Sequence, residues 1–281
     1  MGHQAVQRVV VRMLYDEAFV AKAHERPAEV LGDAGLDAAE QAALLAVDRR
    51  AWRTDPLRRR KTLRTLVEEY KITTTLAFAE TRSLAFVEGY FASPEFHSAV
   101  QERRSIALAF GEFFANALTA GHLKTPQLEA VARLETTMAR CRRGVNAPAA
   151  SAAAAPTQRV ILAPGTAVDA FECNLIETLH RVEQYLFEVG LMPQVALCDD
   201  APRLGDLPEV SSERLCLLLR ASGRDVKMTY LEESMFHLLS ETRTARTPSQ
   251  LAARLGAGAR LDAVKAAVDA LLEEGVLVGA P

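Results

Sequence analysis

Residues 232–281 read EESMFHLLSETRTARTPSQLAARLGAGARLDAVKAAVDALLEEGVLVGAP and decide the fold of the C-terminal part of the chain. Apolar residues recur at helical spacing in three successive stretches of this segment. Thr247-Pro248 marks a helix start, since proline is tolerated at the first helical position, and Gly275 suits a helix end. Val276–Val278 then forms a short apolar tail. We therefore expect three short helices followed by a strand.

The residues before this segment predict strands. Two apolar runs, Arg214–Arg220 and Val226–Leu231, are joined by Ala-Ser-Gly-Arg-Asp, in which Gly223 can adopt a positive φ, and this pattern predicts a hairpin. Arg159–Leu162 is a further candidate strand, and apolar spacing predicts a helix over residues 169–189. The three final helices with their glycine stop and apolar tail predict a winged helix-turn-helix.

Residues 1–145 carry helix signals throughout. Asp37 and Glu40 fit a capping box, and Ser93-Pro94 places a capping oxygen before a proline. The expected helices lie near residues 4–24, 27–32, 38–52, 56–90, 94–120 and 126–143. The predicted fold class is therefore α+β and mostly α, with an all-helical N-terminal domain followed by the winged helix-turn-helix domain.

A linker separates the two predicted domains. Residues 146–158, NAPAASAAAAPTQ, have no large side chain to bury, and two prolines bracket the alanines. Residues 1–145 contain 21 Lys and Arg against 18 Asp and Glu, whereas residues 159–281 contain 12 against 18. We expect a helical partner-docking domain over 1–145 and a peptide-binding domain over 159–281.

Composition narrows the class of protein. The 281 residues are 49% hydrophobic and 25% charged, as in globular proteins, and the net charge of −3 gives no general attraction for nucleic acid or anionic membranes. Aromatic residues make up only 6%, which predicts a core of Leu, Val and Ala. The four cysteines are scattered and no secretory signal is present, so we expect a cytoplasmic protein with reduced thiols and no membrane contact.

The sequence contains no recognisable catalytic or metal-binding motif. None of the six histidines has a second histidine or carboxylate at the spacing of a zinc motif, and no glycine-rich phosphate loop is present. The cysteines form no C-x-x-C pair. We therefore expect no catalytic residue, no metal ligand and no cofactor bound by this chain.

An arginine cluster is the densest charge feature. It comprises Arg49, Arg50, Arg53, Arg58, Arg59, Arg60 and Arg64. One interpretation is a docking surface for a partner protein, a phosphate or an acidic peptide. The other is a solvated face balanced by Asp48, Asp55, Glu68 and Glu69. Under the first interpretation, the predicted partner-docking residues are Arg53, Arg58, Arg59, Arg60 and Arg64.

The predicted winged helix could bind DNA or a peptide. Its candidate recognition segment, SQLAARLGAGAR, has only Arg254 and Arg260 in an acidic domain, which weakens the case for DNA. Alternatively, the hairpin strand could pair with an added peptide strand while the last helix walls an apolar groove. The predicted peptide-binding residues are Val226, Lys227, Met228, Thr229, Tyr230, Val264, Lys265, Val268 and Leu272. Val264 and Val268 could equally belong to the core of the domain.

Two parts of the chain resemble known families. The C-terminal domain, with its leading strands, three helices and final EEGVLVG, resembles the RiPP recognition element, a winged-helix module that captures the leaders of ribosomal precursor peptides. One departure is the predicted helix of about twenty residues between the first strand and the hairpin. Residues 14–52, LYDEAFVAKAHERPAEVLGDAGLDAAEQAALLAVDRRAW, are similar to the small helical subunit of protocatechuate dioxygenases.

The combination resembles accessory proteins that partner multinuclear non-heme iron oxidative enzymes (MNIOs), as in thiaglutamate- and aminopyruvate-forming peptide pathways. The resemblance implies a non-catalytic subunit that binds a precursor leader and forms a heterodimer with an iron enzyme, the iron belonging to the partner. Two alternatives remain open. One is a winged-helix transcriptional regulator that binds DNA, and the other is a small helical subunit of a dioxygenase-type complex.

Overall fold

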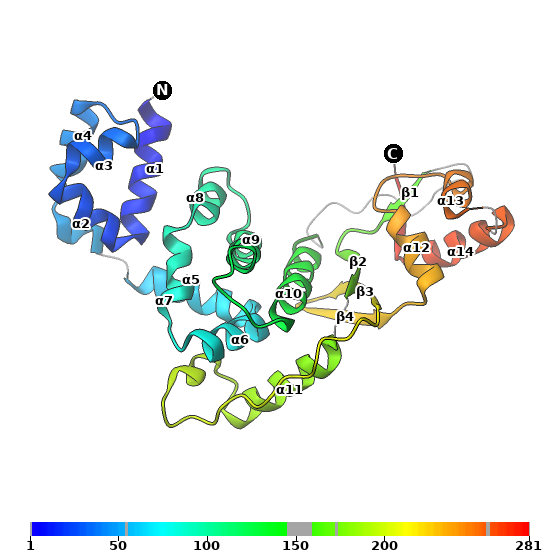
Figure 1. Ribbon diagram of the computed structural model, residues 1–281. Helices are drawn as coiled ribbons and strands as arrows, with labels where there is room; N and C mark the ends of the chain where they lie inside the picture. The colour runs from blue at the N-terminus through cyan, green and yellow to red at the C-terminus, as the bar shows by residue number, and fades with distance from the viewer. Residues whose placement is uncertain (1, 54–55, 145–158, 172–173, 257–258, 281) are drawn as a thin grey trace. The chain divides into compact units, whose positions relative to one another are not determined.

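The computed structural model of the chain describes residues 2–53, 56–144, 159–171, 174–256 and 259–280 and is mostly helical with a few strands (Figure 1). It divides into two compact units. The first contains residues 1–135 and 179–207, and the second contains residues 136–178 and 208–281. The boundary falls inside α10 (Gln127–Gly144) and α11 (Leu175–Glu188). The predicted linker, 146–158, lies outside the described residues.

Two predicted helices before the linker, 27–32 and 126–143, are confirmed to within one residue at each end, and the other four are shortened or interrupted. The observed helical elements are therefore more numerous than predicted. They are α1 (Gly2–Tyr15), α2 (Glu17–Glu25), α3 (Pro27–Asp33), α4 (Ala38–Leu45), η1 (Arg49–Arg53), α5 (Pro56–Glu69), α6 (Lys71–Thr81), α7 (Ala85–Glu88), η2 (Gly89–Ala92), α8 (Pro94–Gln101), α9 (Ile106–Thr119) and α10. Every regular element within 2–53 and 56–144 is helical, as predicted. Within the described ranges, each helix is too short or too polar to cross a lipid bilayer.

A capping hydrogen bond and a positive φ angle explain where two of the predicted long helices break. Asp16 accepts a hydrogen bond from the Phe19 backbone N–H at 2.9 Å, so it caps α2 and divides the predicted helix 4–24. Arg103 has a φ of 54°, which ends α8 and divides the predicted helix 94–120. The capping box of Asp37 and Glu40 is confirmed, with both reciprocal hydrogen bonds present.

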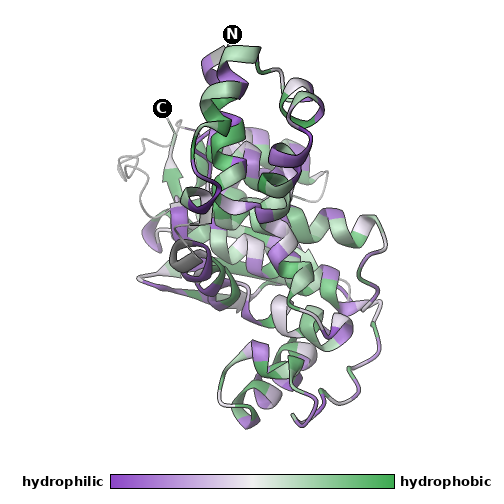
Figure 2. Ribbon diagram, turned by 90° about the vertical axis from the view of Figure 1, so that its left-hand side faces the viewer, coloured by the Kyte–Doolittle hydropathy of each residue, from purple (hydrophilic) through white to green (hydrophobic). Residues whose placement is uncertain are grey.

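The buried residues of the first unit are mostly Leu, Val and Ala, as expected, but its largest buried side chains are aromatic. Its largest fully buried side chains include Tyr70, Phe78, Tyr90, Phe91, Phe96, Phe110 and Phe114. The low overall aromatic content gave no indication of these buried rings, because the aromatic residues are concentrated between residues 70 and 114. The ring of Tyr90 packs edge-on against that of Phe110, with 4.9 Å between centroids. Figure 2 shows hydrophobic and hydrophilic residues interleaved along the helices.

The second unit contains all five strands that the structure describes and three C-terminal helices. These elements are β1 (Val160–Leu162), β2 (Thr166–Phe171), β3 (Leu215–Ser222), β4 (Asp225–Tyr230), α12 (Glu233–Glu241), α13 (Pro248–Leu255), α14 (Leu261–Glu273) and β5 (Leu277–Gly279). β1 pairs antiparallel with β5, and β2, β3 and β4 form an antiparallel sheet in that order. The predicted hairpin, the three helices and the final strand are confirmed.

The predicted helix 169–189 begins later than expected. Residues 169–171 belong instead to β2, which pairs with β3 along Thr166–Phe171, and α11 begins only at Leu175. The apolar spacing of this segment suits a helix locally. Pairing with β3 nevertheless determines the structure, because it satisfies the backbone groups of β2 and buries Val168 and Phe171.

Candidate functional site

The strand β4 forms a free edge of the three-stranded sheet. It pairs with β3 on one side, and the sheet order β2-β3-β4 leaves its other side without a strand partner among the described residues. Such an edge presents backbone N–H and C=O groups to which another extended chain can bind. The predicted peptide-binding residues of the hairpin lie on this strand.

The hydrogen-bond pattern shows which residues of β4 face the edge. Leu231 donates its backbone N–H to the carbonyl oxygen of Cys216 at 3.0 Å, so this pair belongs to the hydrogen-bonded class of the ladder. Hydrogen-bonded and non-hydrogen-bonded pairs alternate in an antiparallel ladder. The register then places Val226, Met228 and Tyr230 in the non-hydrogen-bonded pairs. Their backbone N–H and C=O groups therefore point outward, away from β3.

The two faces of β4 differ in chemistry. Residues directly opposite each other in a ladder lie on the same face, and Met228 and Tyr230 are opposite Leu219 and Leu217. Lys227 and Thr229 are opposite Arg220 and Leu218 and occupy the other face. Leu218 belongs to the core that contains α12, α13 and α14 side chains. The face with Lys227 and Thr229 is therefore the helix face of the sheet, and Met228 and Tyr230 lie on the opposite face.

That opposite face is partly covered by the end of α10. The thiol of Cys141 in α10 is buried and donates to the carbonyl oxygen of Leu219 at 3.8 Å. Arg142 donates from Nε to the carbonyl oxygen of Arg224, in the hairpin turn, at 3.2 Å. β4 itself remains accessible, since Met228 is 42% exposed and Tyr230 is 63% exposed.

The predicted groove between β4 and the last helix is wrong in part. Val264 and Val268 of α14 are buried in the core of the second unit, so they cannot line an open groove, and this corrects their assignment to the peptide site. Leu272 is partly buried against the same core, and Lys265 is exposed. The core side of α14 and the exposed apolar side chains of β4 lie on different faces of the sheet, so the structure does not bring them together.

The arginine cluster is only partly available for docking. Arg59 donates from Nη1 to the carbonyl oxygen of Tyr15 at 3.1 Å, and its guanidinium lies 5.1 Å from the ring centroid of Phe91. These contacts give Arg59 an internal structural role, which corrects its docking assignment. Arg64 is exposed and forms an ion pair with Glu68 at 2.8 Å, and Arg60 is exposed. The side chains of Arg53 and Arg58 lie outside the described part of the chain.

Comparison with known proteins identifies no family for this chain. No protein-family model matches it, and no curated protein is significantly similar to it.

The described residues contain no arrangement that suggests a metal centre. In ranges 2–53, 56–144, 159–171, 174–256 and 259–280, no three His, Cys, Asp or Glu side chains are grouped so that they could hold a metal ion. Cys141, Cys198 and Cys216 are free thiols. Burial raises the pKa of the Cys141 thiol to about 11, which keeps it protonated and poorly nucleophilic at neutral pH.

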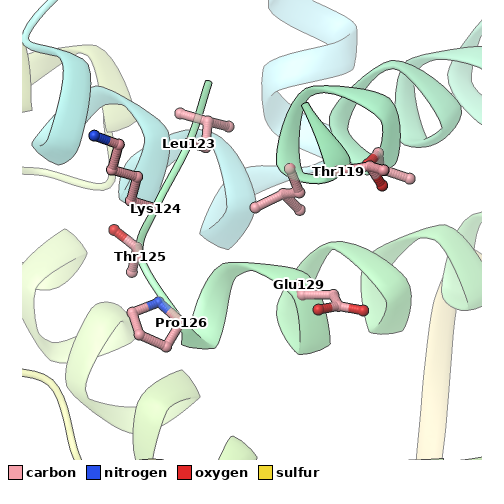
Figure 3. A pocket seen from close by; sticks show the side chains of 8 residues that line it. Thr119, Leu123, Lys124, Thr125, Pro126 and Glu129 are labelled. Carbon is pink, nitrogen blue, oxygen red and sulfur yellow. The ribbon is translucent and has the colours of Figure 1, made fainter. Parts of the chain in front are cut away.

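A pocket in the first unit lies between the end of α9 and the start of α10 (Figure 3). Its volume is about 310 Å³, and its lining residues are Ala115, Leu118, Thr119, Leu123, Lys124, Thr125, Pro126 and Glu129. Glu80 accepts hydrogen bonds from the backbone N–H groups of Lys124 and Thr125 at 2.7 and 3.0 Å, which fixes the loop that forms one wall. None of the predicted site residues lines this pocket.

A second pocket lies on the helices of the second unit. It has a volume of about 500 Å³ and is lined by Ser234, His237, Ser240, Glu241, Arg254, Leu255 and Ala259. Glu241 forms ion pairs with both Arg246 and Arg254. Arg254 is therefore already engaged by a carboxylate, although it belongs to the segment that a DNA-binding winged helix would use.

The first unit has an exposed apolar patch that was not among the predicted sites. Phe187, near the end of α11, is 79% exposed, and Leu191 and Met192 are also exposed. All three residues belong to the first unit. Grouped exposed apolar side chains often mark a surface for protein binding. The helical spacing of Leu179, Val182, Leu186 and Val189 indicates a buried face, and Phe187 lies outside it because it follows Glu183 by four residues.

Proposed function

We propose that this chain is a non-catalytic, cytoplasmic subunit with a winged-helix peptide-binding domain. It binds the leader of a ribosomally made precursor peptide by strand addition to β4 and presents that peptide to an iron-dependent oxidative enzyme. The iron belongs to the partner enzyme. The observation that carries this proposal is the outward orientation of the backbone groups of Val226, Met228 and Tyr230 on an accessible edge strand.

The edge favours a peptide over DNA. Strand addition uses the backbone of any extended chain for affinity and side-chain contacts for selectivity. Major-groove binding requires basic residues on the recognition segment, yet Arg254 is held by Glu241 and residues 159–281 carry more acidic than basic side chains.

Docking of the partner enzyme uses the first unit. Its exposed residue Arg60 provides positive charge, and the patch formed by Phe187, Leu191 and Met192 provides apolar area. Leader binding far from the reacting residue raises the local concentration of that residue at the enzyme, without any catalytic group on this chain.

The test compares retained peptides between edge variants. The tagged chain and its Met228→Pro variant are purified in parallel from cells of its source, and the retained peptides and proteins are identified by mass spectrometry. Proline removes the outward N–H of Met228 but no hydrogen bond to β3, so the sheet is preserved. We expect the variant to lose a short ribosomal peptide while it retains the iron enzyme. Loss of one backbone hydrogen bond predicts a peptide affinity about fivefold weaker.

The control variant is Met228→Ala, which shortens the side chain but keeps the N–H group. It should retain the peptide more strongly than Met228→Pro, as measured by fluorescence anisotropy with a synthetic copy of the retained peptide. Equal retention of the peptide by the wild type and Met228→Pro would refute strand addition at this edge. Retention of duplex DNA in place of a peptide would favour the transcriptional regulator.

A further inference from the structure

The β3–β4 hairpin carries more basic than acidic side chains. Arg220 and Lys227 are paired across the ladder on the helix face, and Arg224 lies in the turn. Asp225 is the single acidic residue between Arg220 and Lys227. Among the described residues, no carboxylate forms an ion pair with Arg220, Arg224 or Lys227.

Neighbouring elements do not remove this positive charge. Arg220 donates to the backbone carbonyl oxygens of Glu274 and Gly275 at 3.0 and 3.4 Å, contacts that involve no carboxylate. Arg142 approaches the turn from α10 and donates to the carbonyl oxygen of Arg224. The hairpin end of β4 is therefore a cationic site, whereas Tyr230 at the other end is followed by Glu232 and Glu233.

Because side chains alternate between the two faces of β4, Lys227 and the exposed apolar side chains lie on opposite faces. A strand added to the edge would alternate its own side chains between the same two faces as β4. On one face these side chains would meet Met228 and Tyr230, both exposed and largely apolar. On the other face they would meet Lys227 and Thr229, both exposed and polar.

We infer that the peptide bound by β4 is an amphipathic strand with an acidic residue beside Lys227 and apolar residues on the face of Met228 and Tyr230. This inference rests on the proposed function, because it describes the ligand of the same edge. Cross-strand pairs of opposite charge and of apolar residues stabilise a ladder, and like charges destabilise it. The acidic residue lies at the end of the bound segment nearest the hairpin turn.

The experiment selects binders from a displayed library of random peptides slightly longer than β4, using the full chain as bait. Wild type should enrich peptides in which apolar residues alternate with polar ones, with Asp or Glu at a polar position near one end. The Lys227→Glu variant should instead enrich Lys or Arg at that polar position. Met228→Ser combined with Tyr230→Ser should lose the apolar preference and keep the acidic one.

The outcomes separate this inference from the proposed function. If wild type enriches no peptide relative to Met228→Pro, the proposed function fails. If peptides are enriched but Lys227→Glu selects the same acidic residues, strand addition stands and the charge inference is overturned. Single-stranded RNA of mixed sequence serves as a competitor. Displacement of the selected peptides by this RNA at equal concentration would also overturn the inference, because the cations would then serve a phosphate backbone.

Discussion

Gly144, at the end of α10, lies directly against the backbone of Gly165, in the turn between β1 and β2. A Cβ atom on Gly144 would be 2.5 Å from the Gly165 nitrogen, closer than any unstrained contact. The absence of a side chain at position 144 therefore allows α10 to approach the sheet closely, with the Cys141 thiol one turn earlier on the Leu219 carbonyl. This contact helps to position α10 against one face of the sheet whose edge strand is β4.

Replacement of Gly144 by alanine should strain this contact. We expect Gly144→Ala to lower the free energy of unfolding by about 1–3 kcal/mol, because either α10 or the β1–β2 turn must shift. Urea denaturation measures the change. Gly32→Ala is the matched control, since a Cβ there would meet only the flexible end of Gln41 at 3.9 Å. A destabilisation no larger than that of Gly32→Ala would show that the close contact between Gly144 and Gly165 does not contribute to stability.

Glu135 anchors the start of α6. Its carboxylate is buried and accepts the backbone N–H groups of Ile72 and Thr73 at 3.0 and 2.9 Å. Glu135→Ala should lower the free energy of unfolding by about 3 kcal/mol, because two buried donors lose a charged acceptor. Glu135→Gln keeps one acceptor oxygen and should lose less. Thermal and chemical denaturation test this order, which an equal loss in both variants would contradict.

His97 should make stability depend on pH. Both ring nitrogens are buried without a hydrogen-bond partner among the described residues, and burial lowers the pKa of the imidazole, as does Arg12, while Asp16 opposes the shift. The unfolded chain therefore binds a proton that the folded chain disfavours. Stability should be fully present above pH 6.5 and decrease as the pH falls below it toward the lower folded-state pKa.

The variant His97→Leu should remove this dependence. Chemical denaturation above and below pH 6.5, at values where carboxyl groups remain ionised, should show a smaller change in free energy of unfolding than wild type. Stability at neutral pH should rise by about 1 kcal/mol if leucine fills the site, because two unpaired buried nitrogens are removed. An unchanged pH slope in the variant would assign the dependence to other groups.

The arginine cluster should separate into structural and docking residues. Arg59→Ala should lower the free energy of unfolding by about 1–2 kcal/mol, because the hydrogen bond to Tyr15 and the contact with Phe91 are lost. Arg60→Ala should change stability by no more than about 0.5 kcal/mol, since the side chain is exposed. Arg60→Ala should instead weaken capture of the partner enzyme, measured by co-purification. Equal stability of the two variants would refute the distinction.

Local chemistry let the sequence alone predict much of the fold. Capping residues such as Asp37 and Thr247 act within one turn of helix, so their motifs are readable without tertiary structure. The sequence also predicted the hairpin, because glycine at position 223 favours the positive φ, here 65°, that the turn needs. The three C-terminal helices and their closing strand follow from apolar spacing and helix-end residues over a short range.

Tertiary structure alone decided the identity of β2, the faces of β4 and the role of Arg59. Residues 169–171 have helical spacing, yet they pair with β3, a segment more than forty residues away. The sequence shows that Val264 and Val268 are apolar, but only the packing of the second unit shows that they are buried in its core. The outward direction of the Met228 N–H depends on the register between β3 and β4. Register is a relation between two strands, and the composition of one strand does not contain it.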